Sequence, residues 1–195
     1  DERSESVKKI GILFLIIVLL TTGCAKEPAV DAHPEWDEYP IRFAEVLAAE
    51  TIEGFTLNET SDVMSIAGLW YATWTAGEGE QIENAQGKEA TVYDAQIYLL
   101  LKEGQTEKGA QNDVLDWIKR EQGAYETTET TLTVNGNEYR VLHLVRGGAD
   151  NPYHHGEAAF LLIGANVVTV EVLAKEGFSG DTEAILRQFL EHLHF

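Results

Sequence analysis

Hydrophobic positions alternate with polar ones in parts of this chain and recur every three to four residues in others, which separates strands from helices. The clearest alternation runs from Asp94 to Lys102 and predicts a half-buried strand. Threonines and aromatic residues favour a strand over 66–76, although the four-residue spacing of Trp70 and Trp74 suits a helix face equally well. Before the strand over 66–76, we expect a brief strand over 54–57 and a polar loop over 58–62. After it, we expect a long polar turn over 77–88.

Helical spacing predicts three helices. The first follows Pro40 and is expected to stop before Gly54. The second lies between Glu107 and Glu121, with Gly123 as its natural stop. The third ends the chain, is capped by Ser179 or Asp181, and carries one apolar stripe made of Ile185, Leu186, Phe189, Leu190 and Leu193.

Two β-hairpins are predicted between the second and third helices. In the first, strands over 132–134 and 139–145 flank Asn135-Gly136, a dipeptide suited to positive φ in a tight turn. In the second, strands over 158–163 and 167–173 flank the turn residues 164–166. Strand runs joined by hairpins, with helices between them and at the end, predict an α+β fold: a largely antiparallel sheet with helices packed on one face and a C-terminal helix.

The N-terminal pattern is of another kind. Lys8-Lys9, the apolar run from Ile10 to Leu20 and the small residues that follow it are typical of a secretory signal, and the run is too short for a comfortable membrane span. Residues 24–38 hold two prolines and many charges without an apolar period, as a tether does. We therefore expect a signal peptide over 1–23, a tether over 24–38 and a single domain over 39–195.

The segment from Leu20 to Cys24 resembles a bacterial lipobox, with Thr21 where that pattern usually has leucine. The resemblance implies that Cys24 is diacylated, with palmitate-type chains, and becomes the first residue of a lipoprotein on the extracytoplasmic face of the cell membrane. An ordinary signal peptide without lipidation is the alternative. The chain is similar to small clostridial lipoproteins of unknown function, a resemblance that implies a location and no activity.

From residue 90 onward the order strand, helix, hairpin, hairpin, helix resembles the Mog1/PsbP-like architecture. That resemblance rests on element order, with no diagnostic motif. It implies a binding or assembly accessory factor rather than a catalyst, and fold alone does not carry function across.

Charge and cysteine content exclude several partners and sites. Residues 1–23 hold three basic and three acidic side chains, so the remainder keeps the full net charge of −19 and nucleic acid is a poor partner. A solvated acidic surface accounts for this charge, and a cationic partner or a cation-rich cell wall is the alternative reading. Because Cys24 is the chain's one cysteine, lipidation leaves no thiol for a disulfide, a thiolate metal site or a nucleophile.

The densest polar cluster is the loop over 147–157, between two predicted strands. Imidazoles beside carboxylates are possible ligands for zinc, but adjacent histidines on an extended backbone point in opposite directions. We therefore expect no metal and no cofactor here, and a solvated turn in which Asp150 and Asn151 bond the local backbone. If the loop is a ligand site, its candidate residues are Asp150, Asn151, Tyr153, His154, His155 and Glu157.

Other residues that could carry chemistry have a structural reading as well. His143 in the strand 139–145 is either a tuned acid or base or a histidine satisfied by its neighbours, and His192 and His194 suit the last turn of the final helix. Trp117 is expected in the core. An aromatic platform for a sugar or peptide is the alternative to core packing for Trp36, Trp70, Tyr71, Trp74 and Tyr93.

No catalytic motif is found: the sequence lacks G-x-S-x-G, H-E-x-x-H and an acidic calcium loop. We therefore expect no enzyme and no catalytic residue, but a non-catalytic binding or accessory domain for a protein or cell-wall ligand, held on the membrane by lipid. One alternative is a hydrolase of cell-wall polymers, which should show two convergent acids with opposed pKa shifts. Another is a structural or assembly factor of a membrane complex, whose deletion would abolish that complex.

Overall fold

The computed structural model describes residues 52–60, 69–83, 87, 89–104, 106–149 and 151–193, without the side chains of 58–60 and 70. The predicted signal peptide, tether and first helix lie outside these residues, as do Asp150 and His194.

A seven-stranded sheet forms the centre of the described part, in the order β1-β2-β5-β9-β8-β7-β6. Every neighbouring pair in it is antiparallel. Its strands are β1 (Thr56–Thr60), β2 (Leu69–Ala76), β5 (Ala95–Lys102), β6 (Glu126–Val134), β7 (Asn137–Val145), β8 (His155–Ile163) and β9 (Asn166–Ala174). A separate hairpin consists of β3 (Glu80–Glu83) and β4 (Glu89–Val92).

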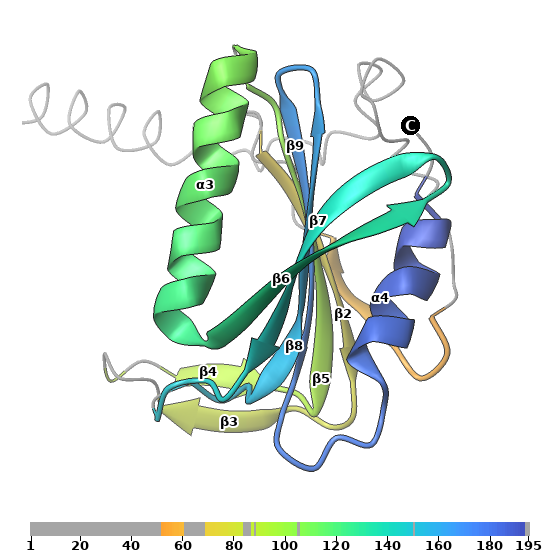
Figure 1. Cartoon of the computed structure of the whole chain (residues 1–195). Helices are drawn as coiled ribbons and strands as arrows, with labels where there is room; N and C mark the ends of the chain where they lie inside the picture. The colour runs from red at the N-terminus through yellow and green to blue at the C-terminus, as the bar shows by residue number, and fades with distance from the viewer. Residues whose placement is uncertain are drawn as a thin grey trace, which may run out of the picture. The chain divides into compact units, whose positions relative to one another are not determined.

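Two helices accompany the sheet, α3 (Glu107–Ala124) and α4 (Thr182–Glu191). Figure 1 shows the sheet nearly edge-on, with α3 on one side of it and α4 on the other. This confirms the α+β class, the antiparallel sheet and the C-terminal helix. The expectation that the helices share one face is wrong.

The alternation of β9 explains why each face needs its own helix. Val168, Val170 and Val172 pack in the cluster that includes Leu186 and Phe189 of α4, whereas Val167 and Leu173 pack in the cluster that includes α3. Because successive side chains of a strand point to opposite faces, a strand that is apolar at nearly every position is buried on both. We refer to the two sides as the α3 face and the α4 face.

Local hydrogen bonds define the N-terminal end of α4 and the C-terminal end of α3. Asp181, rather than Ser179, caps α4, where its Oδ1 accepts from the backbone N–H groups of Glu183 at 3.0 Å and Ala184 at 3.1 Å. The predicted helix over 107–121 is confirmed, but it runs through Gly123 to Ala124. It ends when Tyr125 becomes extended while its N–H still donates to the Glu121 carbonyl.

Several strand boundaries differ from the prediction. The polar turn over 77–88 contains the strand β3, whose Ile82 packs toward the α3 cluster. Residues 58–60 belong to β1 rather than to a loop. The threonine-rich stretch 126–131 extends β6, and β8 begins at His155, so His155 and Glu157 are strand residues. Asn135 and Gly136 do make the predicted tight turn, with φ of 51° and 81°.

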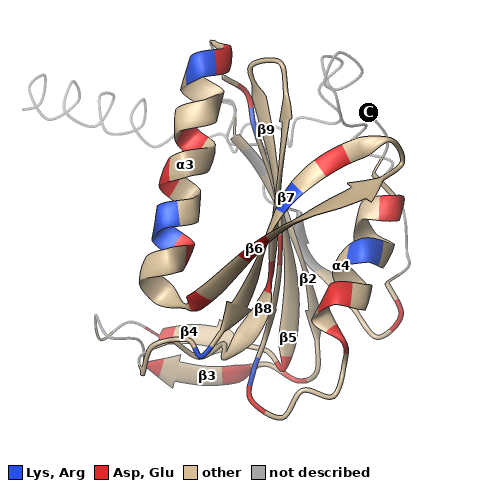
Figure 2. Cartoon of the chain, in the orientation of Figure 1, with Lys and Arg blue, Asp and Glu red and all other residues tan. Residues whose placement is uncertain are grey.

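Charged side chains are spread over the elements drawn in Figure 2 rather than gathered on one of them. This distribution fits the reading of a solvated acidic surface. Among the described helices, none combines the length and the hydropathy that a membrane crossing requires.

Candidate functional site

The loop from Gly147 to His154 is held largely by its own backbone. Gly147 N–H donates to the His154 carbonyl at 3.2 Å, and Asn151 N–H donates to the Gly148 carbonyl at 2.8 Å. The Asn151 side chain accepts from Tyr153 N–H at 3.0 Å, which makes the local turn expected of this residue.

The candidate residues of this loop and of β8 do not converge. Tyr153 is buried with the α3 cluster and its hydroxyl donates to Gln96 Oε1 at 2.9 Å, whereas His154 is exposed. His155 is half-buried at the start of β8. Glu157 is 2% exposed and faces the same side as Ala159, the α4 face. Within the described ranges, which omit Asp150, no three His, Cys, Asp or Glu residues are placed to hold a metal ion.

Glu157 instead makes a contact that the sequence did not predict. Its Oε1 lies 2.5 Å from Nδ1 of His143, which occupies the register position opposite it on β7. Thr182 Oγ1, at the start of α4, donates to the same carboxylate oxygen at 3.5 Å. Burial raises the pKa of Glu157, and the bond from His143 opposes this rise. The side chain of His143 is 51% exposed, so the pair joins the sheet to α4 and leaves part of the imidazole at the surface.

A second polar network lies on the α3 face, and its residues are not among the candidate site residues predicted from the sequence. Arg120 of α3 donates from Nε to Glu121 Oε1 and from Nη2 to Glu171 Oε1, both at 2.9 Å. Glu171, in the middle of β9, is 8% exposed and Glu121 is 5% exposed. Burial and the neighbouring Glu121 carboxylate raise the pKa of Glu171 to about 7, against the opposing effect of Arg120.

Aromatic side chains continue this network across the sheet. Tyr98 of β5 lies at the register position opposite Glu171, and Thr73 of β2 lies opposite Tyr98. The rings of Tyr71 and Tyr98 lie 5.7 Å apart between centroids, at an interplanar angle of 32°. The side chains of Tyr71, Thr73 and Tyr98 are half-buried.

The helix α3 borders this area. It packs on β9, β8 and β6, and β5 and β2 continue the same face of the sheet beyond it. Lys102 of β5 bonds Asp113 of α3 at 2.8 Å, and its Nζ lies 6.0 Å from the centre of the Trp117 ring. We define the β2–β5 strip as Tyr71, Thr73, Tyr98, Trp117 and Arg120.

Of the described side chains considered for an aromatic platform, Tyr71 lies in the strip, whereas Trp74 and Tyr93 do not. Trp74 is 3% exposed and packs edge-on against Phe189 of α4 at 4.9 Å, so it belongs to the core. Tyr71 lies in the strip, Tyr93 is half-buried, and Trp36 and the Trp70 side chain are outside the described residues. Trp117, expected in the core, is half-buried at the edge of the α3 cluster rather than inside it, and its ring centre lies 6.0 Å from Lys102 Nζ.

One signal for the network was present in the sequence. Glu171 interrupts the apolar run of β9, and a charge in a strand that is buried on both faces requires a partner. Its partner Arg120 could not be identified, because helical periodicity does not show which strand a helix crosses.

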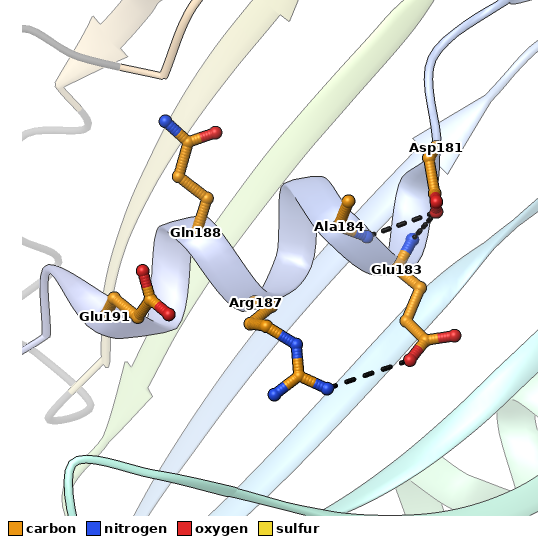
Figure 3. Close-up of a pocket in the computed structure, with 6 residues that line it drawn as sticks. All are labelled: Asp181, Glu183, Ala184, Arg187, Gln188 and Glu191. Atoms are coloured by element: carbon orange, nitrogen blue, oxygen red, sulfur yellow. Dashed lines mark hydrogen bonds and ion pairs between the residues drawn. The ribbon is translucent and has the colours of Figure 1, made fainter.

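A pocket of about 360 Å³ lies along the exposed side of α4 (Figure 3). Its described lining belongs to that helix and its cap, where Asp181 caps the N-terminus and Glu183 pairs with Arg187 at 3.9 Å. These contacts stabilise the helix. At the other end of α4, His192 also stabilises the helix, as the sequence predicts: its Nδ1 lies 2.8 Å from the Gln188 carbonyl.

No protein-family model matches the sequence, and no curated protein matches it. Among solved structures, the chain is similar to the solution structure of cyanobacterial PsbP (CyanoP) from Synechocystis sp. PCC 6803. The TM-score is 0.38 and the sequence identity is 12%, over 75% of this chain and 95% of that chain. The matched protein is a PsbP, the name borne by the architecture that the order of elements from residue 90 onward resembles.

Proposed function

We propose that this chain is a lipid-anchored protein of the extracytoplasmic face of the cell membrane, whose domain binds a protein or cell-wall ligand without catalysis. The anchor is supported by the lipobox-like sequence that ends at Cys24. The binding role is supported by the β2–β5 strip.

The observation that carries the binding role is the fixation of Arg120 beside paired tyrosines. Its guanidinium is bonded to Glu121 and Glu171, and both carboxylates are nearly buried. A side chain held in this way loses little conformational freedom when a ligand arrives, so less binding free energy is spent on ordering it. The half-buried rings of Tyr71 and Tyr98 add contact area with few rotatable bonds.

A hydrolase of cell-wall polymers is the second candidate, and the pair of His143 and Glu157 favours it. A carboxylate bonded to Nδ1 fixes the orientation of an imidazole, as a general base requires. In this role His143 would take a proton from water at Nε2. Release of soluble sugar from isolated cell walls, lost in His143→Ala, would establish this candidate in place of the first.

The test of the proposed function is sedimentation of the detergent-solubilised full-length protein with an isolated cell envelope from which the lipids have been extracted, so that the acyl chains at Cys24 cannot carry the protein into the pellet. We expect the wild type to sediment with the envelope and Tyr71→Ala to remain largely in solution. The matched control is Phe178→Ala, because Phe178 is a half-buried aromatic residue on the α4 face, where it packs against Phe55 at 6.4 Å. The control should sediment like the wild type.

Failure of the wild type to sediment would contradict the binding role. Equal sedimentation of wild type, Tyr71→Ala and Phe178→Ala would contradict the assignment of the strip. Circular dichroism of each variant shows whether it is folded, so that a loss of binding can be separated from a loss of structure.

A further inference from the structure

The charged groups around the β2–β5 strip are already paired with one another. Arg120 uses Nε and Nη2 for Glu121 and Glu171, and Lys102 is paired with Asp113. The Glu121 and Glu171 side chains are 7% and 11% exposed, whereas the Arg120 side chain is 57% exposed. A ligand that reaches the strip therefore meets a guanidinium edge and not the two carboxylates that neutralise it.

This pairing restricts the charge of the ligand. A cationic ligand would meet the exposed Arg120 before the nearly buried Glu121 and Glu171, and would compete with bonds of 2.9 Å that already exist. An anionic ligand would approach a chain whose net charge is −19. Both charged classes are disfavoured, which leaves neutral ligands.

The remaining surface of the strip is aromatic and hydroxylic. Tyr71, Tyr98 and Trp117 supply rings, and Thr73 supplies a hydroxyl group. Arg120 has five N–H donors, of which the bonds to Glu121 and Glu171 use two. Such a surface matches a ligand with an apolar face, which contacts rings, and neutral hydroxyl or amide groups at its rim, which take part in hydrogen bonds. A sugar ring has this combination.

We infer that the β2–β5 strip binds neutral sugar rings, such as those of a cell-wall glycan. This inference rests on the proposed function and narrows its ligand from protein or wall polymer to glycan. The sugar packs its C–H face on Tyr71 and Tyr98, while Arg120 donates to a ring substituent.

The test is calorimetric titration of the full-length protein in detergent with two matched oligosaccharides. One is a tetramer of β-linked N-acetylglucosamine, which is neutral, and the other is the same tetramer after complete deacetylation, which is cationic. We expect the neutral tetramer to bind at least about tenfold more tightly, a difference of about 1.4 kcal/mol. Tyr98→Ala and Tyr71→Ala should each weaken its binding about tenfold, and Phe178→Ala should leave it unchanged.

Each failure has its own meaning. If the protein sediments with the envelope through Tyr71 but neither tetramer binds, the sugar inference is overturned and the proposed function stands. Tighter binding of the deacetylated tetramer would overturn the argument from charge. Neutral-tetramer binding that is unaffected by the tyrosine variants would overturn the assignment to the strip, and absence of both envelope and sugar binding would overturn both proposals.

Discussion

Tyr98 and Glu171 lie opposite each other on the neighbouring strands β5 and β9, so a phenol and a nearly buried carboxyl group share the face of the sheet next to Arg120. Burial raises the pKa of Tyr98, and the charge of Glu171 raises it further. Burial likewise raises the pKa of Glu171 to about 7. The charge at the centre of the site therefore changes close to neutral pH.

The raised pKa makes stability depend on pH in a defined window. Because Glu171 binds its proton more tightly in the folded state, unfolding releases that proton, and stability falls as the pH rises from about 4.5 to about 7. Glu171→Gln should equal the wild type near pH 5 and be the more stable protein at pH 8, by an amount on the order of 3 kcal/mol at most. Urea denaturation at both pH values measures this. Parallel pH profiles of the two proteins would show that Glu171 titrates normally.

Removal of Arg120 should have the opposite dependence. Arg120→Ala leaves Glu121 and Glu171 without their cation, and this costs most when Glu171 is ionised. We expect a loss of about 1 to 2 kcal/mol at pH 8, discounted because the guanidinium is 57% exposed, and a smaller loss at pH 5. The matched control is Arg187→Ala, which removes an exposed pair on α4 and should cost less than about 0.5 kcal/mol at either pH. An equal effect of both variants would refute the role of Arg120.

Two tryptophans should respond differently to truncation. Trp74 is 3% exposed against Phe189, so Trp74→Ala should lower the free energy of unfolding by about 3 to 5 kcal/mol. Trp117 is half-buried, and Trp117→Ala should cost only about 1 to 2 kcal/mol. Thermal denaturation of the two variants provides the comparison. If Trp117→Ala lowered the free energy of unfolding as much as Trp74→Ala does, the Trp117 ring would lie in the core and not in the strip.

The proposed lipid anchor at Cys24 predicts that a variant without this cysteine changes its location. A single acyl chain gives marginal membrane binding and two chains hold firmly, so the diacylated cysteine should decide retention. Cys24→Ala should appear in the soluble fraction or accumulate as a precursor. Fractionation of cells that produce each form measures this, and equal membrane retention of the variant and the wild type would exclude lipidation at Cys24 as the anchor.

His154 at the end of the loop and His155 at the start of β8 should not bind zinc. His154 is exposed and His155 is half-buried next to it, and the described residues around them contain no third ligand in place. Zinc at micromolar concentration should leave the melting temperature of the wild type unchanged, as in His154→Ala/His155→Ala. A zinc-dependent rise that disappears in the double variant would overturn this expectation, since a ligand that binds only the folded state must raise its stability.

Periodicity and turn chemistry predicted the regular elements well. The alternation from Asp94 to Lys102 and the Asn135-Gly136 turn are local patterns, and both appear in the structure as expected. The side of the sheet that each helix covers depends on contacts between distant residues, although the apolar residues of β9 already indicate a strand buried on both faces. In this apolar strand, Glu171 is the one charged residue.

The candidate site was harder to predict, for the same reason. The loop over 147–157 was selected because its polar residues are adjacent in sequence, but Tyr153 and Glu157 serve opposite faces of the sheet. The strip combines residues of β2, β5 and α3, and Glu171 of β9 holds its Arg120, so these elements are adjacent only after folding. In a sequence, tyrosines at alternating strand positions show the same pattern whether they lie in the core or at a surface. The course of the helix over the sheet distinguishes the two cases.

Hydroxyl-radical footprinting of the full-length protein with and without isolated cell walls tests directly whether the β2–β5 strip is the binding surface. We expect Tyr71, Tyr98 and Trp117 to become protected from oxidation when the walls are present. Leu115 and Leu162, which are 45% and 40% exposed outside the strip, should be oxidised equally in both states. Protection of these leucines or of α4, with the three aromatic residues of the strip unchanged, would contradict the account.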